Sequence, residues 1–156
     1  MSQRLLYLVL LIFVLSLVGM AAGAEGLKGE YYHAVIMADA WKNHVLTRID
    51  PMVNFDWGSD SPDPAINDNG FMVRWTGTIE VPDSETYTFY IRTDDGAKLW
   101  LNNELIADTW TYAQKWQATR EGVIEDSGNF ALNGGQQYEI ILEYYERSNA
   151  AVCELS

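Results

Sequence analysis

The feature that most constrains the fold is an alternation of apolar and polar residues in several short segments. In 71–81, apolar residues such as Phe71, Val73 and Trp75 occupy alternate positions, and apart from Met72 the residues of the opposite face are polar. A period of two places successive side chains on opposite faces of a strand, which indicates half-buried antiparallel strands. The same period recurs in later segments that are rich in aromatic and β-branched residues: 86–92, 97–102, 137–145 and 150–155.

Turn-forming residues separate these segments. They are Pro82-Asp83-Ser84, Asp94-Asp95-Gly96, Asn102-Asn103 and Asn133-Gly134-Gly135. Only 36–44 and 112–118 have the composition of short helical turns, and 56–70 is predicted to be a long, solvated polar loop. Many short strands joined by turns predict an all-β fold, an antiparallel β-sandwich or barrel.

The first 24 residues have the organisation of a secretory signal peptide. Arg4 gives a basic start, residues 5–18 are almost wholly apolar, and Ala22 and Ala24 have the A-x-A spacing of a cleavage site. We therefore predict a signal peptide over 1–24 and one secreted or cell-surface domain over 25–156. The alternative is an uncleaved membrane anchor, because residues 5–24 carry no charge over about the length that spans a bilayer.

The predicted domain is strongly acidic. Arg4 is the only charged residue before position 25, so 22 acidic and 9 basic residues remain, a net charge of −13. This charge argues against partners such as nucleic acids and anionic membranes, and it agrees with the binding of divalent cations. The single cysteine, Cys153, excludes an internal disulfide. We expect it to be buried in its apolar strand; the alternative is a disulfide-linked dimer.

Two adjacent aspartates, Asp94 and Asp95, precede Gly96 between two predicted strands. One interpretation is an ordinary solvated hairpin turn, since glycine adopts a positive φ at no steric cost. The other is a cation site, because two like charges ~4 Å apart near a surface repel by a few kcal/mol. Ca²⁺ accepts carboxylate, carbonyl and water oxygens in irregular geometry. From the residues alone both interpretations stay open.

A series of motifs resembles the PA14 domain family, whose members are β-sandwich modules attached to glycosidases, adhesins and bacterial toxins. The motifs follow one another over nearly all of residues 25–156: GLKGEYY at 26–32, WG at 57–58, PDP at 62–64, FMVRWTG at 71–77, YTF at 87–89, DDGAKLWL at 94–101 and YEI…EYY at 138–145. Their joint order and spacing make the resemblance specific, and it implies a PA14-like β-sandwich.

The resemblance also implies a calcium-dependent sugar site. In sugar-binding members, two adjacent aspartates joined by a cis peptide bind Ca²⁺, and the ion binds sugar hydroxyls; Asp94 and Asp95 match this pair. A loop before the last strand adds an asparagine in those members, and Asn149 is the matching candidate here.

Three aromatic residues follow the aspartate pair along the chain. Because aromatic faces pack on sugar rings, we predict that Trp110, Tyr112 and Trp116 line the site; the alternative is burial in the core.

No arrangement typical of a catalytic site is legible. His33 and His44 lack metal-ligand spacing, there is no G-x-S-x-G motif, and no histidine is paired with Cys153. We therefore predict a secreted, non-catalytic, lectin-like or adhesion module that binds glycans or cell-surface polysaccharide through Ca²⁺. The alternative is a structural or protein-interaction module of the cell envelope or extracellular matrix.

Overall fold

The computed structural model describes residues 25–34, 41–116 and 122–156. In these ranges the chain forms strands and one short helix: β1 (Leu27–His33), β2 (Asn43–Asp50), β3 (Asn54–Gly58), β4 (Phe71–Glu80), β5 (Glu85–Asp94), β6 (Gly96–Leu101), β7 (Glu104–Asp108), α1 (Thr109–Trp116), β8 (Ile124–Leu132), β9 (Gln137–Glu146) and β10 (Ala151–Leu155). The predicted signal peptide lies outside the described residues. Within them, no helix is long and apolar enough to cross a membrane.

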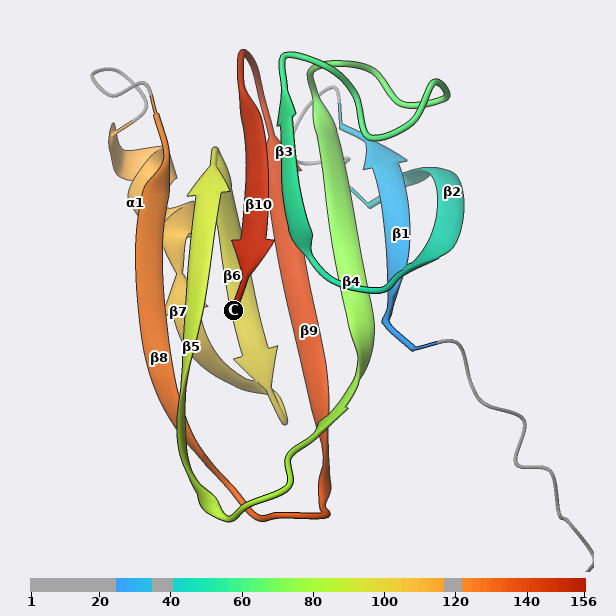
Figure 1. Cartoon of the computed structure of the whole chain (residues 1–156). Coiled ribbons are helices and arrows are strands. Elements are labelled where there is room, and N and C mark those ends of the chain that lie inside the picture. The colour runs from blue at the N-terminus through green and yellow to red at the C-terminus, as the bar shows by residue number, and fades with distance from the viewer. Residues whose placement is uncertain (1–24, 35–40, 117–121) are drawn as a thin grey trace, which may run out of the picture.

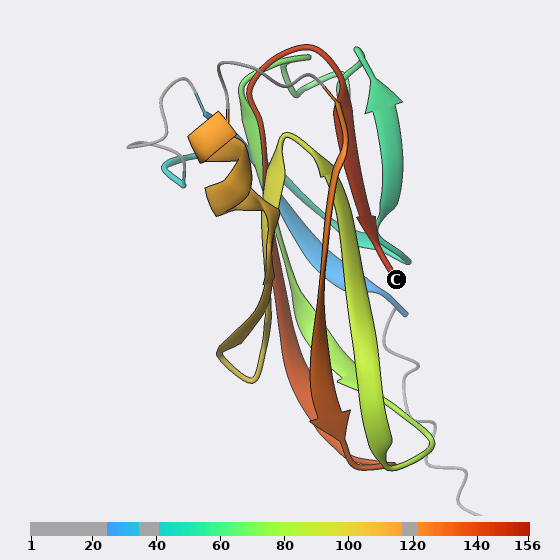
Figure 2. The same cartoon turned by 90° about the vertical axis from the view of Figure 1, so that its left-hand side faces the viewer.

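Two antiparallel sheets face each other, as predicted (Figure 1). One sheet has six strands in the order β2-β1-β4-β9-β6-β7, and the other has four in the order β3-β10-β5-β8. The short helix α1 packs beside β6, and Figure 2 shows it on the outer side of the six-stranded sheet. The molecule is therefore an antiparallel β-sandwich with a small helical cover at one end.

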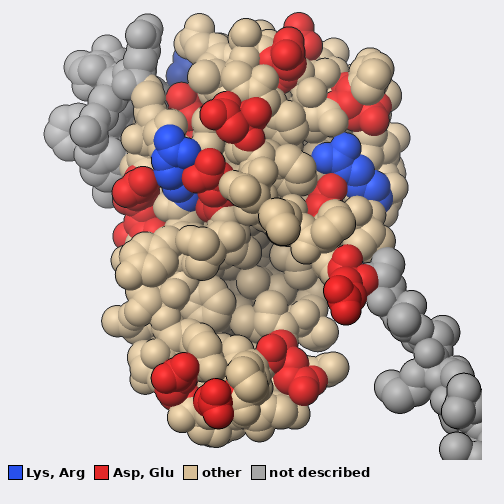
Figure 3. Space-filling model, viewed as in Figure 1, with Lys and Arg blue, Asp and Glu red and all other residues tan. Residues whose placement is uncertain are grey.

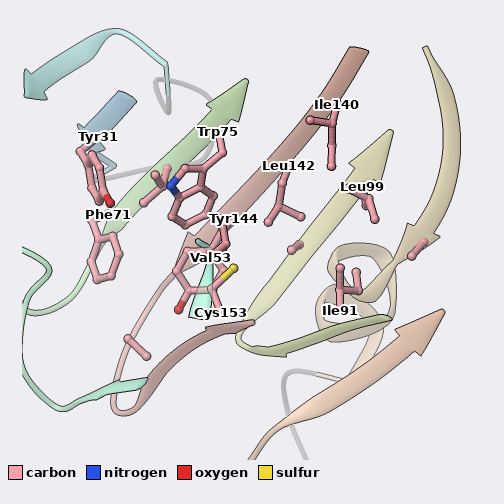
Figure 4. Close-up of a cluster of buried hydrophobic side chains, with 14 of the residues drawn as sticks. Tyr31, Val53, Phe71, Trp75, Ile91, Leu99, Ile140, Leu142, Tyr144 and Cys153 are labelled. Atoms are coloured by element: carbon pink, nitrogen blue, oxygen red, sulfur yellow. The ribbon is translucent and has the colours of Figure 1, made fainter. Parts of the chain in front are cut away.

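The core lies between the sheets and follows the period-two pattern. Strand β9 buries Tyr138, Ile140, Leu142 and Tyr144, which are alternate residues along the chain. Several of the buried side chains from both sheets are drawn in Figure 4, where Trp75 lies among Tyr31, Phe71 and Tyr144. Each large apolar side chain that is removed from water stabilises the fold by roughly 1.5–3 kcal/mol, so this layer holds the two sheets together.

Cys153 lies inside this core and is 0% exposed. Its predicted burial is confirmed. The thiol is therefore out of reach of a second chain in the folded state.

A buried polar cluster joins β1, β2 and β4 in the six-stranded sheet. The carboxylate of Asp50 accepts hydrogen bonds from Tyr31 Oη, Arg48 Nε and Trp75 Nε1, each at 2.7 Å. Three donors satisfy the buried acid, so its burial does not leave an unpaired charge.

The sequence analysis did not predict four of the strands, namely β2, β3, β7 and β8. They are the edge strands of the two sheets. Their side chains are largely exposed or half-buried, so their sequences lack a clean apolar face. The predicted helical turn at 36–44 is wrong where it overlaps the described residues, because Asn43 and His44 begin β2. Residues 35–40 lie outside them.

Two further predictions are adjusted by the structure. The loop predicted over 56–70 begins later, because residues 56–58 complete β3 and Trp57 stacks on Phe55 at 4.7 Å. The helical turn predicted over 112–118 is confirmed up to Trp116 as part of α1, and residues 117–118 lie outside the described residues.

The surface over the four-stranded sheet carries many more acidic than basic side chains (Figure 3). Its bases are mostly engaged: Arg92, for example, lies 2.9 Å from Glu154 and 3.5 Å from Glu125. This face is therefore negatively charged.

Candidate functional site

The aspartate pair lies where the chain passes from one sheet to the other. Strand β5 of the four-stranded sheet ends at Asp94, and β6 of the six-stranded sheet begins at Gly96. The hairpin interpretation is therefore wrong, since β5 and β6 do not pair and Gly96 does not have a positive φ. The peptide bond between Asp94 and Asp95 is cis.

Gly96 is needed for a close approach rather than for a turn. A Cβ atom at this position would lie 2.8 Å from Trp110 Cα and 2.8 Å from Tyr145 Cε1. Such contacts are too short for any real side chain. The start of α1 and the ring of Tyr145 can therefore lie against the bend only because residue 96 has no side chain.

Two threonines fasten α1 to the same bend. Thr109 Oγ1 accepts the Ala97 backbone N–H at 2.8 Å and lies 2.7 Å from Thr93 Oγ1. Both threonines are fully buried. The first residue of α1 is thus hydrogen-bonded to the strands on either side of the aspartate pair.

Each aspartate is held by a separate contact from the end of β9. The Tyr144 hydroxyl donates a hydrogen bond to the Asp94 carbonyl oxygen. The backbone N–H of Arg147 donates to Asp95 Oδ2 at 2.8 Å. The bend and the loop at 147–150 therefore lie side by side, as expected for two segments of one site.

Both aspartates resist ionisation. The pKa of Asp94 is raised to about 6, first by burial and then by the negative charge of Asp95. Burial also raises the pKa of Asp95, although the Arg147 amide, the Arg147 charge and the Ser148 amide act in the opposite direction. The contacts within the chain thus compensate the two negative charges only in part, and a nearby cation would stabilise both.

Glu146 is a third acid at this site, and the sequence analysis missed it. Its side chain is 2% exposed, Oε2 lies 3.4 Å from Tyr144 Oη, and Oε1 is a buried atom without a hydrogen-bond partner. Burial, followed by the charges of Asp95 and Asp94, raises the pKa of Glu146 to about 8. The sequence did contain a sign of its burial. Glu146 is the next alternate position after Tyr144, so it belongs to the inward-facing residues of β9.

Asn149 lies in the loop that contacts Asp95. It has a φ of 80°, and its backbone N–H donates to Asn69 Oδ1 at 2.9 Å. Among the hydrogen bonds of the described residues, none joins Asn149 to Asp94 or Asp95. The structure brings the loop to the pair, and the role of Asn149 as a metal ligand stays a prediction.

The three aromatic candidates belong to α1. The Trp110 ring is half-buried, and its centroid is 4.6 Å from that of Tyr145 in a second apolar cluster on the outer side of the six-stranded sheet. One side of the ring thus packs on the chain itself, and the role of Trp110 as a sugar platform stays a prediction. The side chains of Tyr112 and Trp116 lie outside the described part of the structure, so their predicted role stays a prediction.

The carboxylates of Asp94 and Asp95 can hold Ca²⁺ only if neutral oxygens complete the coordination of the ion. Within the described ranges, no three Asp, Glu, His or Cys side chains are arranged to hold a metal ion. Two poorly compensated carboxylates and the unpaired Glu146 Oε1 nevertheless favour a positive charge here. Ca²⁺ takes six to eight oxygens from carboxylates, backbone and amide carbonyls and water, so two carboxylates with neutral oxygens around them are a donor set that this ion could use.

Comparison with known proteins agrees with this description. The sequence model of the PA14 domain matches residues 23–153. Over 131 residues the chain is 39% identical to the anti-sigma-I factor RsgI3 of Acetivibrio thermocellus, a match that covers 84% of this chain and 18% of RsgI3.

Solved structures show the same fold. An anti-sigma factor domain-containing protein is 39% identical with a TM-score of 0.73, over 84% of this chain and 42% of that one. The PA14 sugar-binding domain from an RTX adhesin is 22% identical with a TM-score of 0.62, over 85% of this chain and 89% of that one. The chain thus spans less than half of the anti-sigma relatives that it matches.

Proposed function

Because this chain belongs to the PA14 domain family, we propose that it is a non-catalytic carbohydrate-binding module whose Asp94 and Asp95 hold a Ca²⁺ ion. The observation that carries the proposal is the pair of adjacent, partly desolvated carboxylates at the bend between the sheets. Bound calcium would supply a positive charge whose remaining coordination positions suit adjacent hydroxyls of a sugar.

The residues of the chain prepare the pair for this role. The Tyr144 hydroxyl holds the Asp94 carbonyl, and the Arg147 amide orients the Asp95 carboxylate. The loop that contains Asn149 lies beside the pair and provides amide and carbonyl oxygens as further ligands. Preorganisation of this kind lowers the entropic cost of binding an ion.

The fold shared with the sugar-binding domain of the RTX adhesin supports a glycan ligand. Residues 1–24 support a location outside the cell or at its surface, either after cleavage or with the module anchored by this segment. A glycan or cell-surface polysaccharide is then the partner.

A second candidate function is a protein-interaction or structural module, and it is favoured by the 39% identity to an anti-sigma factor. In that case the aspartates would bind an ion that stabilises the fold, or none. The two functions differ in whether the chain binds a glycan at all, and in whether that binding requires calcium.

Thermal unfolding with calcium and with EDTA tests the ion. At a calcium concentration 100 times the Kd, binding to the folded state adds about 2.7 kcal/mol, or ~10 °C in Tm for a domain of this size. Asp94→Asn and Asp95→Asn should each abolish the rise. Asp83→Asn, an exposed turn acid, is the matched control and should retain it.

Glycan-array binding with and without EDTA then separates the functions. Binding that EDTA and Asp94→Asn both abolish would support the carbohydrate module. A calcium-dependent Tm without glycan binding would favour the structural alternative. No calcium effect on the wild-type chain would refute the proposed site.

A further inference from the structure

Glu146 lies between the two contacts that hold the aspartate pair. It is the last residue of β9, two positions after Tyr144, which holds Asp94, and one position before Arg147, whose amide holds Asp95. The same end of one strand therefore places a contact on each aspartate, and along the chain a carboxylate comes between these two contacts.

One oxygen of this carboxylate lacks a hydrogen-bond partner, although the group also accepts a hydrogen bond from the Asp95 backbone. Its side chain is 2% exposed, and Oε1 has no hydrogen-bond partner. The only hydroxyl near Oε2 among the described residues is that of Tyr144, at 3.4 Å, and its single proton already serves the Asp94 carbonyl. Buried polar atoms are almost always paired, so an orphan beside two other acids indicates an absent positive or proton-donating group.

We infer that Glu146 is a third carboxylate of the cation site, which acts on the ion through a bound water molecule rather than by direct contact. The inference rests on the proposed calcium site. A water is required because the three acids are not arranged to contact one ion together. Such a water would donate a hydrogen bond to Oε1, and the third negative charge would favour ions of higher charge.

The charge dependence gives a test that a purely structural role would not pass. Affinities for Ca²⁺ and for Tb³⁺ are measured by isothermal titration calorimetry on the wild-type chain and on Glu146→Gln, which keeps the size of the side chain. Coulomb energy is proportional to the charge of the ion, so a loss of about 10-fold for Ca²⁺ predicts a loss of about 30-fold for Tb³⁺.

Two controls separate charge from shape. Glu139→Gln makes the same change at an exposed position of β9 and should leave both affinities unchanged. Tyr144→Phe removes the hydroxyl but keeps the Glu146 carboxylate. It should therefore lower the affinities for Ca²⁺ and Tb³⁺ by the same factor.

The outcomes are distinct. A wild-type chain that binds neither ion would overturn the calcium site together with this inference. Wild-type binding of both ions, with Glu146→Gln affinities that are unchanged or reduced equally, would overturn the inference and leave the proposed function intact.

Discussion

The acid Glu146 should make the ion-free protein less stable as the pH rises. In the unfolded chain its carboxyl has the ordinary pKa of 4.5, whereas in the folded protein the pKa is raised to about 8. Between these values the unfolded chain releases the proton and the folded chain keeps it. The contribution to stability is therefore complete below pH 4.5 and is lost progressively up to about pH 8.

The structure sets the size of the effect. Over this window the free energy of unfolding falls by about 1.4 kcal/mol per pH unit from this group, which amounts to about 3 kcal/mol at pH 7. Glu146→Gln removes the titration while it keeps the side-chain volume. In EDTA the variant should therefore match the wild type near pH 4.5 and exceed its Tm by roughly 10 °C at pH 7.

The assay is thermal or urea unfolding of both proteins in EDTA at half-unit steps from pH 4.5 to 8. Only the difference between them is interpreted, because the acidic surface affects both equally. Glu139→Gln, the exposed acid on the same strand, should show no such trend. The reasoning would be refuted by a difference that does not change with pH, or by a variant that is less stable than the wild type at pH 7.

Two further changes test the fold around the site and the core. Asp50→Ala should lower the free energy of unfolding by about 3–5 kcal/mol in urea denaturation, because three donors lose their acceptor in a buried cluster; a loss below 1 kcal/mol would contradict this. Gly96→Ala should cost about 1–3 kcal/mol and reduce the calcium-induced rise in Tm, because the new methyl group would displace the start of α1 at Trp110. A stable variant with an unchanged calcium response would show that the close approach is not required.

The interior strands could be predicted because their sequences carry the evidence of their burial. Phe71, Val73 and Trp75 occupy alternate positions, and all three are fully buried in β4. The edge strands could not be predicted in this way. Strand β8 has paired neighbours on one side and mostly exposed side chains, so its residues need not alternate.

At the bend formed by Asp94 and Asp95, too, the sequence predicted one part of the structure and not the other. Adjacent like charges next to a glycine marked the position as unusual, and the motif order implied its chemistry. A turn and a crossover between sheets, however, look alike in sequence. Only strand pairing shows that β5 and β6 belong to different sheets and that Gly96 makes room for α1.

By itself, the sequence determined that this protein is built from packed antiparallel sheets. Apolar residues at every second position form one face of each interior strand, and that face must be buried. The tertiary structure decided what surrounds the acids. Glu146 is 52 residues from Asp94 along the chain, and it becomes a third carboxyl group near the pair only because β9 ends beside the crossover. Burial and the field of neighbouring charges depend on distance in space, which residue order alone does not specify.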